Sequence, residues 1–172
     1  MNLVLRPAAM ADAAALTAIQ LAARTSADIP NLHTAAEDLA FHQGLVAGKT
    51  VMVAEWDGVP VGFAVTHDGW LDHLWILPEF HRQGIGRVLL AWARKSGDLK
   101  LYVFTHNTRA IAFYRAHGAV QIAESDGQGN EERLPDLTPA RQGLTGAPEG
   151  AALLSVRKHG EGRSWPSRPV WR

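Results

Sequence analysis

The feature that most constrains this chain is an apolar strand that leads into a glycine-containing loop and then a leucine-rich helix. The strand covers Leu71–Leu77, the loop covers His81–Gly86, and the helix covers Gly84–Lys95. The two glycines let the backbone approach a ligand closely, and a helix N-terminus carries a partial positive charge. We therefore expect an anion site, suited to a diphosphate, at this turn.

Two common phosphate loops do not match these residues. The third glycine and the later acidic residue of the dinucleotide fingerprint are missing, and no Gly-Lys-Ser/Thr follows as in a P-loop. Two glycines at this spacing also occur in ordinary strand-to-helix turns, so the loop alone is weak evidence. The rest of the chain has to decide between these interpretations.

Hydrophobic patterning predicts strands and helices on both sides of the loop. The expected strands are Asn2–Arg6, Thr50–Glu55, Val59–Thr66, Leu71–Leu77, Lys100–Thr105 and Val120–Ala123. The expected helices are Asp12–Ala23, one that follows the capping-box pattern at 34–37 and ends at 44–48, Gly84–Lys95 and Asn107–His117. Asp12 is expected to cap the first helix. A hairpin turn is expected at 56–58. This order predicts a mixed α/β, or α+β, sheet.

Composition narrows the partners. The 172 residues carry 17 basic and 17 acidic side chains, so the formal net charge of zero indicates neither a nucleic-acid nor a membrane partner. The absence of cysteine excludes disulfides and thiol nucleophiles. No apolar run reaches the roughly 20 residues that span a bilayer, and no signal peptide is evident at the N-terminus. We expect a cytoplasmic protein, and the eight histidines show no metal-binding spacing.

Two motifs together resemble those of one family. In its context, His81–Gly86 closely resembles motif A of the GCN5-related N-acetyltransferases, the GNAT superfamily, whose pattern is Arg/Gln-x-x-Gly-x-Gly/Ala. This chain departs from the pattern with His81 at the first position. Asn107–Gly118 resembles motif B, in which an asparagine starts a helix that carries a tyrosine and ends at glycine. The resemblance extends from Asn2 to about Glu132.

The resemblance implies the GNAT acyl-CoA N-acyltransferase fold, a mixed central sheet splayed between two parallel strands and flanked by helices. Acetyl-CoA would then be the co-substrate, held where those strands separate, with no metal required. The cofactor-binding residues that the resemblance implies are Leu74, Trp75 and Ile76 on the strand, Arg82, Gln83, Gly84, Ile85, Gly86 and Arg87 in the loop, and Asn107.

The resemblance also implies catalytic residues. Tyr114 matches the family's general acid, and a phenol of pKa about 10 suits a thiolate whose conjugate acid has a pKa of about 8.5. Without the motif, Tyr114 would be interpreted as a packed aromatic side chain. The acceptor amine also needs a base, but Tyr102 stands where ribosomal-protein N-acetyltransferases of this superfamily carry a glutamate. His73 is our first candidate for the base, although it can equally be a strand residue with no role. The other candidates are Asp72, Glu55 and, more weakly, His106.

Two functions follow from this resemblance. The first is an N-acetyltransferase, in which a primary amine attacks the thioester of acetyl-CoA directly within a ternary complex. The second is a catalytically silent module that binds or senses acyl-CoA. The acceptor can be a small molecule or a protein amine, and a homodimer is one alternative for the oligomeric state. We expect the GNAT domain to cover residues 1–134 and a divergent or disordered tail to cover 135–172, with one candidate strand at 151–156.

Overall fold

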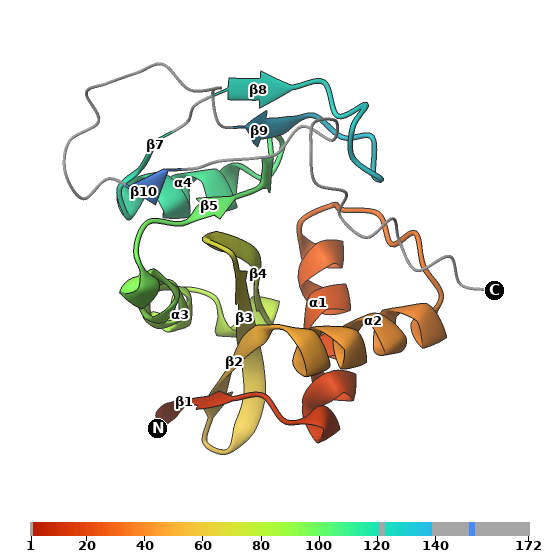
Figure 1. The fold of residues 1–172 in the computed structure, drawn as a ribbon, viewed down its shortest axis with the longest axis vertical. Coiled ribbons are helices and arrows are strands. Elements are labelled where there is room, and N and C mark those ends of the chain that lie inside the picture. The colour runs from red at the N-terminus through yellow and green to blue at the C-terminus, as the bar shows by residue number, and fades with distance from the viewer. Residues whose placement is uncertain (1, 121–122, 139–151, 154–172) are drawn as a thin grey trace.

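The computed structural model of this protein describes residues 2–120, 123–138 and 152–153 (Figure 1). Its α-helices are α1 (Ala13–Ser26), α2 (Ala35–Gly48), α3 (Ile85–Ala93) and α4 (Thr108–Ala116). Three short 3-10 helices are η1 (Met10–Asp12), η2 (Pro78–Phe80) and η3 (Arg94–Ser96). In the described part of the chain, no helix combines the length and apolar character needed to cross a bilayer.

The strands form one large sheet and two small ones. The large sheet has the order β1-β2-β3-β4-β5, built from β1 (Leu3–Pro7), β2 (Thr50–Trp56), β3 (Val59–His67), β4 (Trp70–Ile76) and β5 (Lys100–Leu101). Neighbours are antiparallel except for the parallel pair β4–β5. The small sheets, of order β6-β9-β8 and β10-β7, contain β6 (Val103–Phe104), β7 (Ala119–Val120), β8 (Ala123–Ser125), β9 (Asp136–Thr138) and β10 (Ala152–Leu153).

Alternation along the strands gives the large sheet two apolar faces. On one face, Val53 and Phe63 pack with residues of α1 and α2. On the other face, Ala54 and Ala64 pack with residues of α3 and with Tyr114 of α4. Figure 1 shows α3 on one side of the sheet and the α1–α2 pair on the other. Helices covering both faces of a mixed sheet confirm the expected fold class.

The parallel pair separates soon after it forms. Trp70 pairs with Lys100 and Leu71 with Leu101, and in the described residues the two strands share no later pair. The chain then continues into β6, which pairs with β9 instead of β4. One edge of β4 from Asp72 onward is therefore left without a neighbouring strand, which is the splayed geometry that we expected.

Several local expectations are confirmed. Thr34 accepts a hydrogen bond from the Glu37 N–H, and the Glu37 carboxylate accepts one from the Thr34 N–H, so α2 begins with a capping box. The hairpin turn between β2 and β3 has positive φ at both Asp57 (49°) and Gly58 (82°), as a two-residue hairpin turn of this hand requires. Both features depend on residues close together in sequence.

Other local expectations are corrected. Asp12 does not cap α1, because its carboxylate accepts hydrogen bonds from the Arg6 guanidinium and the Ala9 N–H instead. The strand expected over 100–105 is divided at Tyr102 into β5 and β6, since these two pieces join different sheets. Where one strand was expected over 120–123, the chain forms β7 and β8 on either side of residues 121–122, which lie outside the described residues.

The expected tail also contributes strands. β9 lies beyond residue 134, where we expected the tail to begin, and it pairs with both β6 and β8. Of the candidate strand at 151–156, residues 152–153 form β10 beside β7, and the remaining residues of that range lie outside the described part of the chain.

Candidate functional site

The glycine loop follows the unpaired edge of β4. The chain leaves β4 at Ile76 and passes through η2, and α3 begins at Ile85. Arg82 (φ 64°) and Gly84 (φ 82°) both take the left-handed conformation that turns the backbone back toward the sheet. A Cβ on Gly84 would meet nothing within 4 Å, so the glycine is required by its backbone conformation and not by crowding.

The loop presents a row of free donors. In the part of the chain that the structure describes, no hydrogen bond is made by the backbone N–H groups of residues 82–87. Val88 is the first residue whose N–H is used, donating to the Gly84 carbonyl at 3.2 Å. The free N–H groups add to the partial positive charge at the start of α3, and the exposed Arg82 and Arg87 add full charges. This is the chemistry of an anion site.

Gly86, the second glycine of the loop, is required for a different reason. A Cβ on Gly86 would lie 3.2 Å from Ile76 Cδ1 and 3.3 Å from two ring atoms of Phe113. Gly86 is buried, so it allows the first turn of α3 to lie close to the end of β4 and to α4. The sequence suggested that both glycines serve close approach of a ligand, whereas at Gly86 the close approach is made by the protein itself.

The strand residues expected to contact the cofactor divide between the two faces of β4. Leu74 and Ile76 lie on the α3 and α4 side, where they join the core that contains Tyr114. Trp75 lies on the opposite side, and its indole Nε1 donates to His73 Nδ1 at 3.1 Å. The backbone edge of all three strand residues follows the point where β5 turns away from β4.

The motif-B helix lies on the α3 side of the sheet. Asn107 caps α4, with its Oδ1 accepting from the Ala110 N–H at 3.1 Å. Within the described residues the Asn107 Nδ2 amide makes no hydrogen bond, so its two donors can serve a ligand. Tyr114 is 7% exposed, and burial raises the pKa of its phenol above the ordinary value. Tyr114 therefore stays protonated at neutral pH and has a proton to donate.

His73 lies on the opposite face of β4 from Tyr114's core. The pKa of His73 is lowered to about 3, mainly by desolvation, with smaller contributions from nearby His42, Lys49 and Arg24. The imidazole is therefore neutral at pH 7. Because Nδ1 accepts from the Trp75 indole, the ring proton is assigned to Nε2.

The other candidate bases are engaged elsewhere. Asp72 pairs with Lys49 at 2.6 Å, and Glu55 pairs with Arg6 at 2.7 Å on another strand. The Nε2 of His106 donates to the Ala27 carbonyl at 3.0 Å. Asp72 and Glu55 are therefore each held against a cationic side chain, whereas the contact of His106 uses only the N–H of its ring.

Comparison with known proteins decides the family. The sequence profile of the acetyltransferase (GNAT) family matches residues 16–119, a span that contains β4, the glycine loop and α4. The chain belongs to the GNAT family. The resemblance drawn from the two motifs is confirmed.

Similar sequences and similar structures come from several organisms. An N-acetyltransferase of Archaeoglobus fulgidus is 35% identical over 98 residues, which is 47% of this chain and 66% of that protein. The match thus spans just under two thirds of that relative. YjaB of Escherichia coli, in its apo form, is 24% identical with a TM-score of 0.67, covering 80% of this chain and 95% of its own. The yncA protein of Salmonella typhimurium, solved with acetyl-CoA, is 22% identical with a TM-score of 0.60, covering 78% and 90%.

This chain departs from the GNAT motif-A pattern at His81, whose side chain packs against the end of β4. His81 Nε2 donates to the Ile76 carbonyl at 3.1 Å, which fixes the ring against the end of β4. Its Nδ1 is buried and has no hydrogen-bond partner among the described residues. Burial lowers the pKa of His81, and the charge of Arg109 on α4 lowers it further. The positive charge of Arg109 therefore acts on His81 at the start of the glycine loop.

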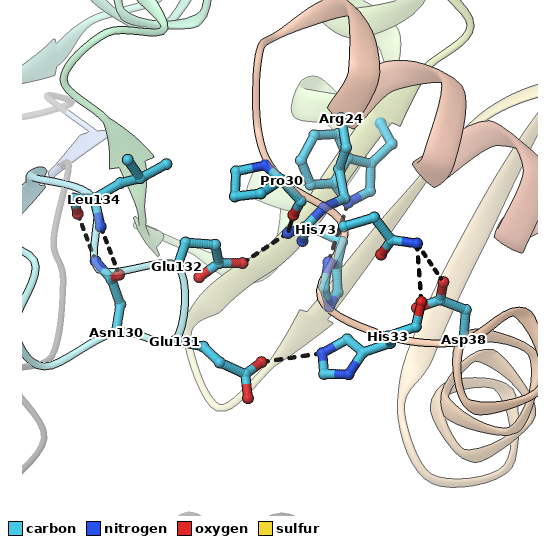
Figure 2. Close-up of polar contacts among 11 residues, drawn as sticks. Arg24, Pro30, His33, Asp38, His73, Asn130, Glu131, Glu132 and Leu134 are labelled. Atoms are coloured by element: carbon cyan, nitrogen blue, oxygen red, sulfur yellow. Dashed lines mark hydrogen bonds and ion pairs between the residues drawn. The ribbon is translucent and has the colours of Figure 1, made fainter.

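A second group of charged residues, to which the sequence assigned no role, lies on the α1–α2 side. This charge cluster comprises Arg24 of α1, His33 of the α1–α2 loop, and Glu131 and Glu132 of the β8–β9 loop (Figure 2). Arg24 pairs with Glu132 at 2.9 Å and His33 with Glu131 at 3.1 Å. The paired residues are 108 and 98 positions apart, so no local pattern could have joined them.

The β8–β9 loop is held in shape by Asn130. Its Nδ2 donates to the Leu134 carbonyl at 2.7 Å and to Asp136 Oδ2 at 2.8 Å, and its Oδ1 accepts from the Leu134 N–H at 3.1 Å. Figure 2 shows the two Asn130–Leu134 bonds beside Glu131 and Glu132 of the same loop. The position of the charge cluster is therefore determined by β9 and its loop.

Proposed function

We propose that this chain is an acetyl-CoA-dependent N-acetyltransferase that acts on a primary amine. The observation that carries the proposal is the unpaired edge of β4, followed after the short η2 helix by the free N–H groups of residues 82–87. A strand edge can hydrogen-bond the amides of a pantetheine arm, and the loop can bind a diphosphate. The yncA neighbour with this fold was solved with acetyl-CoA, which supports the same co-substrate here.

The proposed cofactor contacts follow the course of the chain. The backbone of residues 74–76 would bind the arm, the loop N–H groups of 82–87 the diphosphate, and the Nδ2 amide of Asn107 the arm near the second strand. Arg82 and Arg87 are exposed beside the loop and would add charge attraction. A Cβ would find open space at Gly84, so this side of the loop has room for a ligand.

The proposed reaction is a direct transfer within a ternary complex. The amine nitrogen forms a bond to the thioester carbon, the carbon–sulfur bond breaks, and Tyr114 gives its proton to the departing sulfur. Backbone N–H groups at the end of β4 would stabilise the negative charge that develops on the carbonyl oxygen. The products are an N-acetyl amine and free coenzyme A.

His73 is our proposed base. It lies beside Leu74 on β4 and is uncharged at neutral pH, which is the form that a base requires. A weak base is sufficient if the proton leaves after the carbon–nitrogen bond has formed, because the adduct nitrogen is more acidic than a free ammonium group. The Trp75 indole must then release Nδ1 of His73, or water must relay the proton.

The state of His73 also supports a second candidate function. A pKa of about 3 and an occupied Nδ1 make His73 a poor proton acceptor before substrate arrives. A chain with an intact cofactor site and no effective base would be an acyl-CoA-binding module without turnover. The two functions share the cofactor site and differ only in the fate of the acetyl group.

One experiment separates them. Coenzyme A release is measured over a panel of primary amines with the wild-type chain and with Tyr114→Phe. Acetylation requires turnover on at least one amine and a fall in kcat of about 100-fold or more in the variant. Binding of acetyl-CoA by calorimetry without turnover on any amine would establish the binding module instead. Gly84→Glu should abolish acetyl-CoA binding, and unchanged affinity would overturn the placement of the diphosphate.

A further inference from the structure

On the Nε–Nη2 edge of the Arg24 guanidinium, only Nη2 donates hydrogen bonds within the described part of the chain. Nη2 donates both to the Pro30 carbonyl and to Glu132 Oε1, the latter at 2.9 Å. Nε lies on the same side of the guanidinium and is buried, yet it has no hydrogen-bond partner among the residues that the structure describes. Carboxylates prefer to bind this edge with two parallel hydrogen bonds, one to Nε and one to Nη2. Glu132 satisfies only half of that arrangement.

The contact is nearly enclosed. The side chains of Arg24 and Glu132 are only 13% and 14% exposed, although each comes from a different part of the chain. An unpartnered buried N–H is costly, so a ligand that supplies the second acceptor gains more than it would at an exposed site. A ligand carboxylate that binds Arg24 through both Nε and Nη2 can therefore displace the carboxylate of Glu132.

Arg24 lies near His73, the proposed base on β4. Its charge contributes to the lowered pKa of His73, which is next to Leu74 on the unpaired part of β4. Figure 2 shows Arg24, Glu132 and His73 in one region of the protein, together with the His33–Glu131 pair. A small molecule with one end on Arg24 can thus present its other end toward the edge of β4.

We propose that the acceptor is a small zwitterion of the amino-acid class, whose carboxylate replaces Glu132 on the Nε–Nη2 edge of Arg24. This inference rests on the proposed acetyltransferase function and adds the class of its acceptor. The released Glu132 then faces the ammonium group of the same molecule and holds it until the proton is lost. The residue that determines specificity is Arg24.

Charge balance separates this class from the alternatives. A zwitterion replaces the Arg24–Glu132 pair with two new pairs, so neither buried charge is left alone. An amine without a carboxylate can pair with Glu132 only by leaving Arg24 unpaired. A carboxylate without an amine leaves Glu132 unpaired. The cost of a stranded buried charge therefore favours the molecule that carries both.

The test compares acceptors that differ only in the carboxylate. Free amino acids, their amides and the corresponding decarboxylated amines are assayed for kcat/KM with acetyl-CoA at saturation. We expect the free amino acids to exceed both other groups. In Arg24→Gln this advantage should fall on the order of 10- to 100-fold, the value of a bidentate charge-assisted contact. Arg24→Lys keeps the charge without the planar edge, so its preference for free amino acids should lie between those of the wild type and Arg24→Gln.

Controls keep the result interpretable. Glu131→Gln removes a neighbouring carboxylate of the charge cluster and should leave the amino-acid preference unchanged. Thermal unfolding shows whether Arg24→Gln is folded, and Arg24→Lys is used if it is not. Equal kcat/KM on amino acids and amides, or an equal loss on all acceptors in Arg24→Gln, would overturn the inference and leave the acetyltransferase intact.

The failure of the proposed function gives a different result. In that case no acceptor is acetylated, and the chain is tested by calorimetry instead. Leucine and leucinamide are titrated into the wild-type and Arg24→Gln proteins saturated with coenzyme A. Leucine binding that is tighter than leucinamide binding, and is lost in the variant, would support the carboxylate site. Equal binding of the two would refute it.

Discussion

Gly86 should tolerate an added methyl group only if Phe113 yields. Gly86→Ala places a Cβ 3.3 Å from the Phe113 ring and 3.2 Å from Ile76 Cδ1, closer than ordinary carbon contacts. The terminal methyl of Ile76 can rotate away. The Phe113 ring is held by an edge contact with Tyr114, with centroids 5.1 Å apart, and by a tilted contact with His117 at 4.5 Å. Crowding at Phe113 therefore decides the outcome.

Two opposing contributions set the magnitude. Replacing a helical glycine by alanine stabilises by about 1 kcal/mol. Overpacking a buried site costs about 1–3 kcal/mol. The net loss of unfolding free energy for Gly86→Ala should thus lie between about 0 and 2 kcal/mol. Phe113→Leu, which opens the site, should remove the crowding and leave the helix gain, so the double variant should be more stable than the sum of its parts.

Urea unfolding of the two single variants and the double variant gives this coupling directly. We expect an interaction of at least about 0.5 kcal/mol in the stabilising direction, and acetyl-CoA affinity that weakens in Gly86→Ala and recovers in the double variant. Gly84→Ala is the matched control, because its Cβ meets nothing within 4 Å and its cost comes from the backbone alone. Additivity of the Gly86 and Phe113 substitutions within about 0.3 kcal/mol would refute the reasoning.

The remaining predictions concern stability. Gly62→Ala puts a Cβ 2.9 Å from the Trp75 carbonyl oxygen, and because backbone cannot yield easily the unfolding free energy should fall by about 1–3 kcal/mol; a change below about 0.5 kcal/mol would contradict this packing. Thr34→Ala removes the cap of α2 and should cost about 1 kcal/mol in urea unfolding, whereas an unchanged midpoint would mean that the cap contributes nothing. Stability should also fall as the pH drops from about 6.5 toward 3, because burial keeps the pKa of His73 at about 3 while the unfolded chain takes up its proton near pH 6.5. His73→Leu should therefore have a shallower decline, by up to about 1.4 kcal/mol per pH unit, and equal slopes in the two proteins would be evidence against a neutral His73.

Local chemistry explains which expectations were confirmed. The capping box at Thr34 and the hairpin turn at Asp57 each require only a few neighbouring residues, so the sequence pattern was sufficient. The two motifs that indicated the family are also short runs of neighbouring residues. Asp12 has the residue type of a cap, but Arg6 offers its carboxylate a paired guanidinium that no local rule includes.

Segments that pair over long distances were predicted less well. Tyr102 interrupts what looks like one strand, because the residues before it pair with β4 and those after it pair with β9. That division opens the edge of β4, so the geometry of the proposed cofactor site depends on a strand more than 30 positions later.

The sequence by itself determined the glycine loop and the asparagine and tyrosine of the following helix. These features depend on backbone conformation and helix capping, which neighbouring residues control. Only the tertiary structure decided that Gly86 is needed for packing, that His73 is neutral, and that Arg24 meets Glu132. Each of these depends on burial or on charges from distant segments, and such long-range desolvation and pairing leave no periodic signal in the chain.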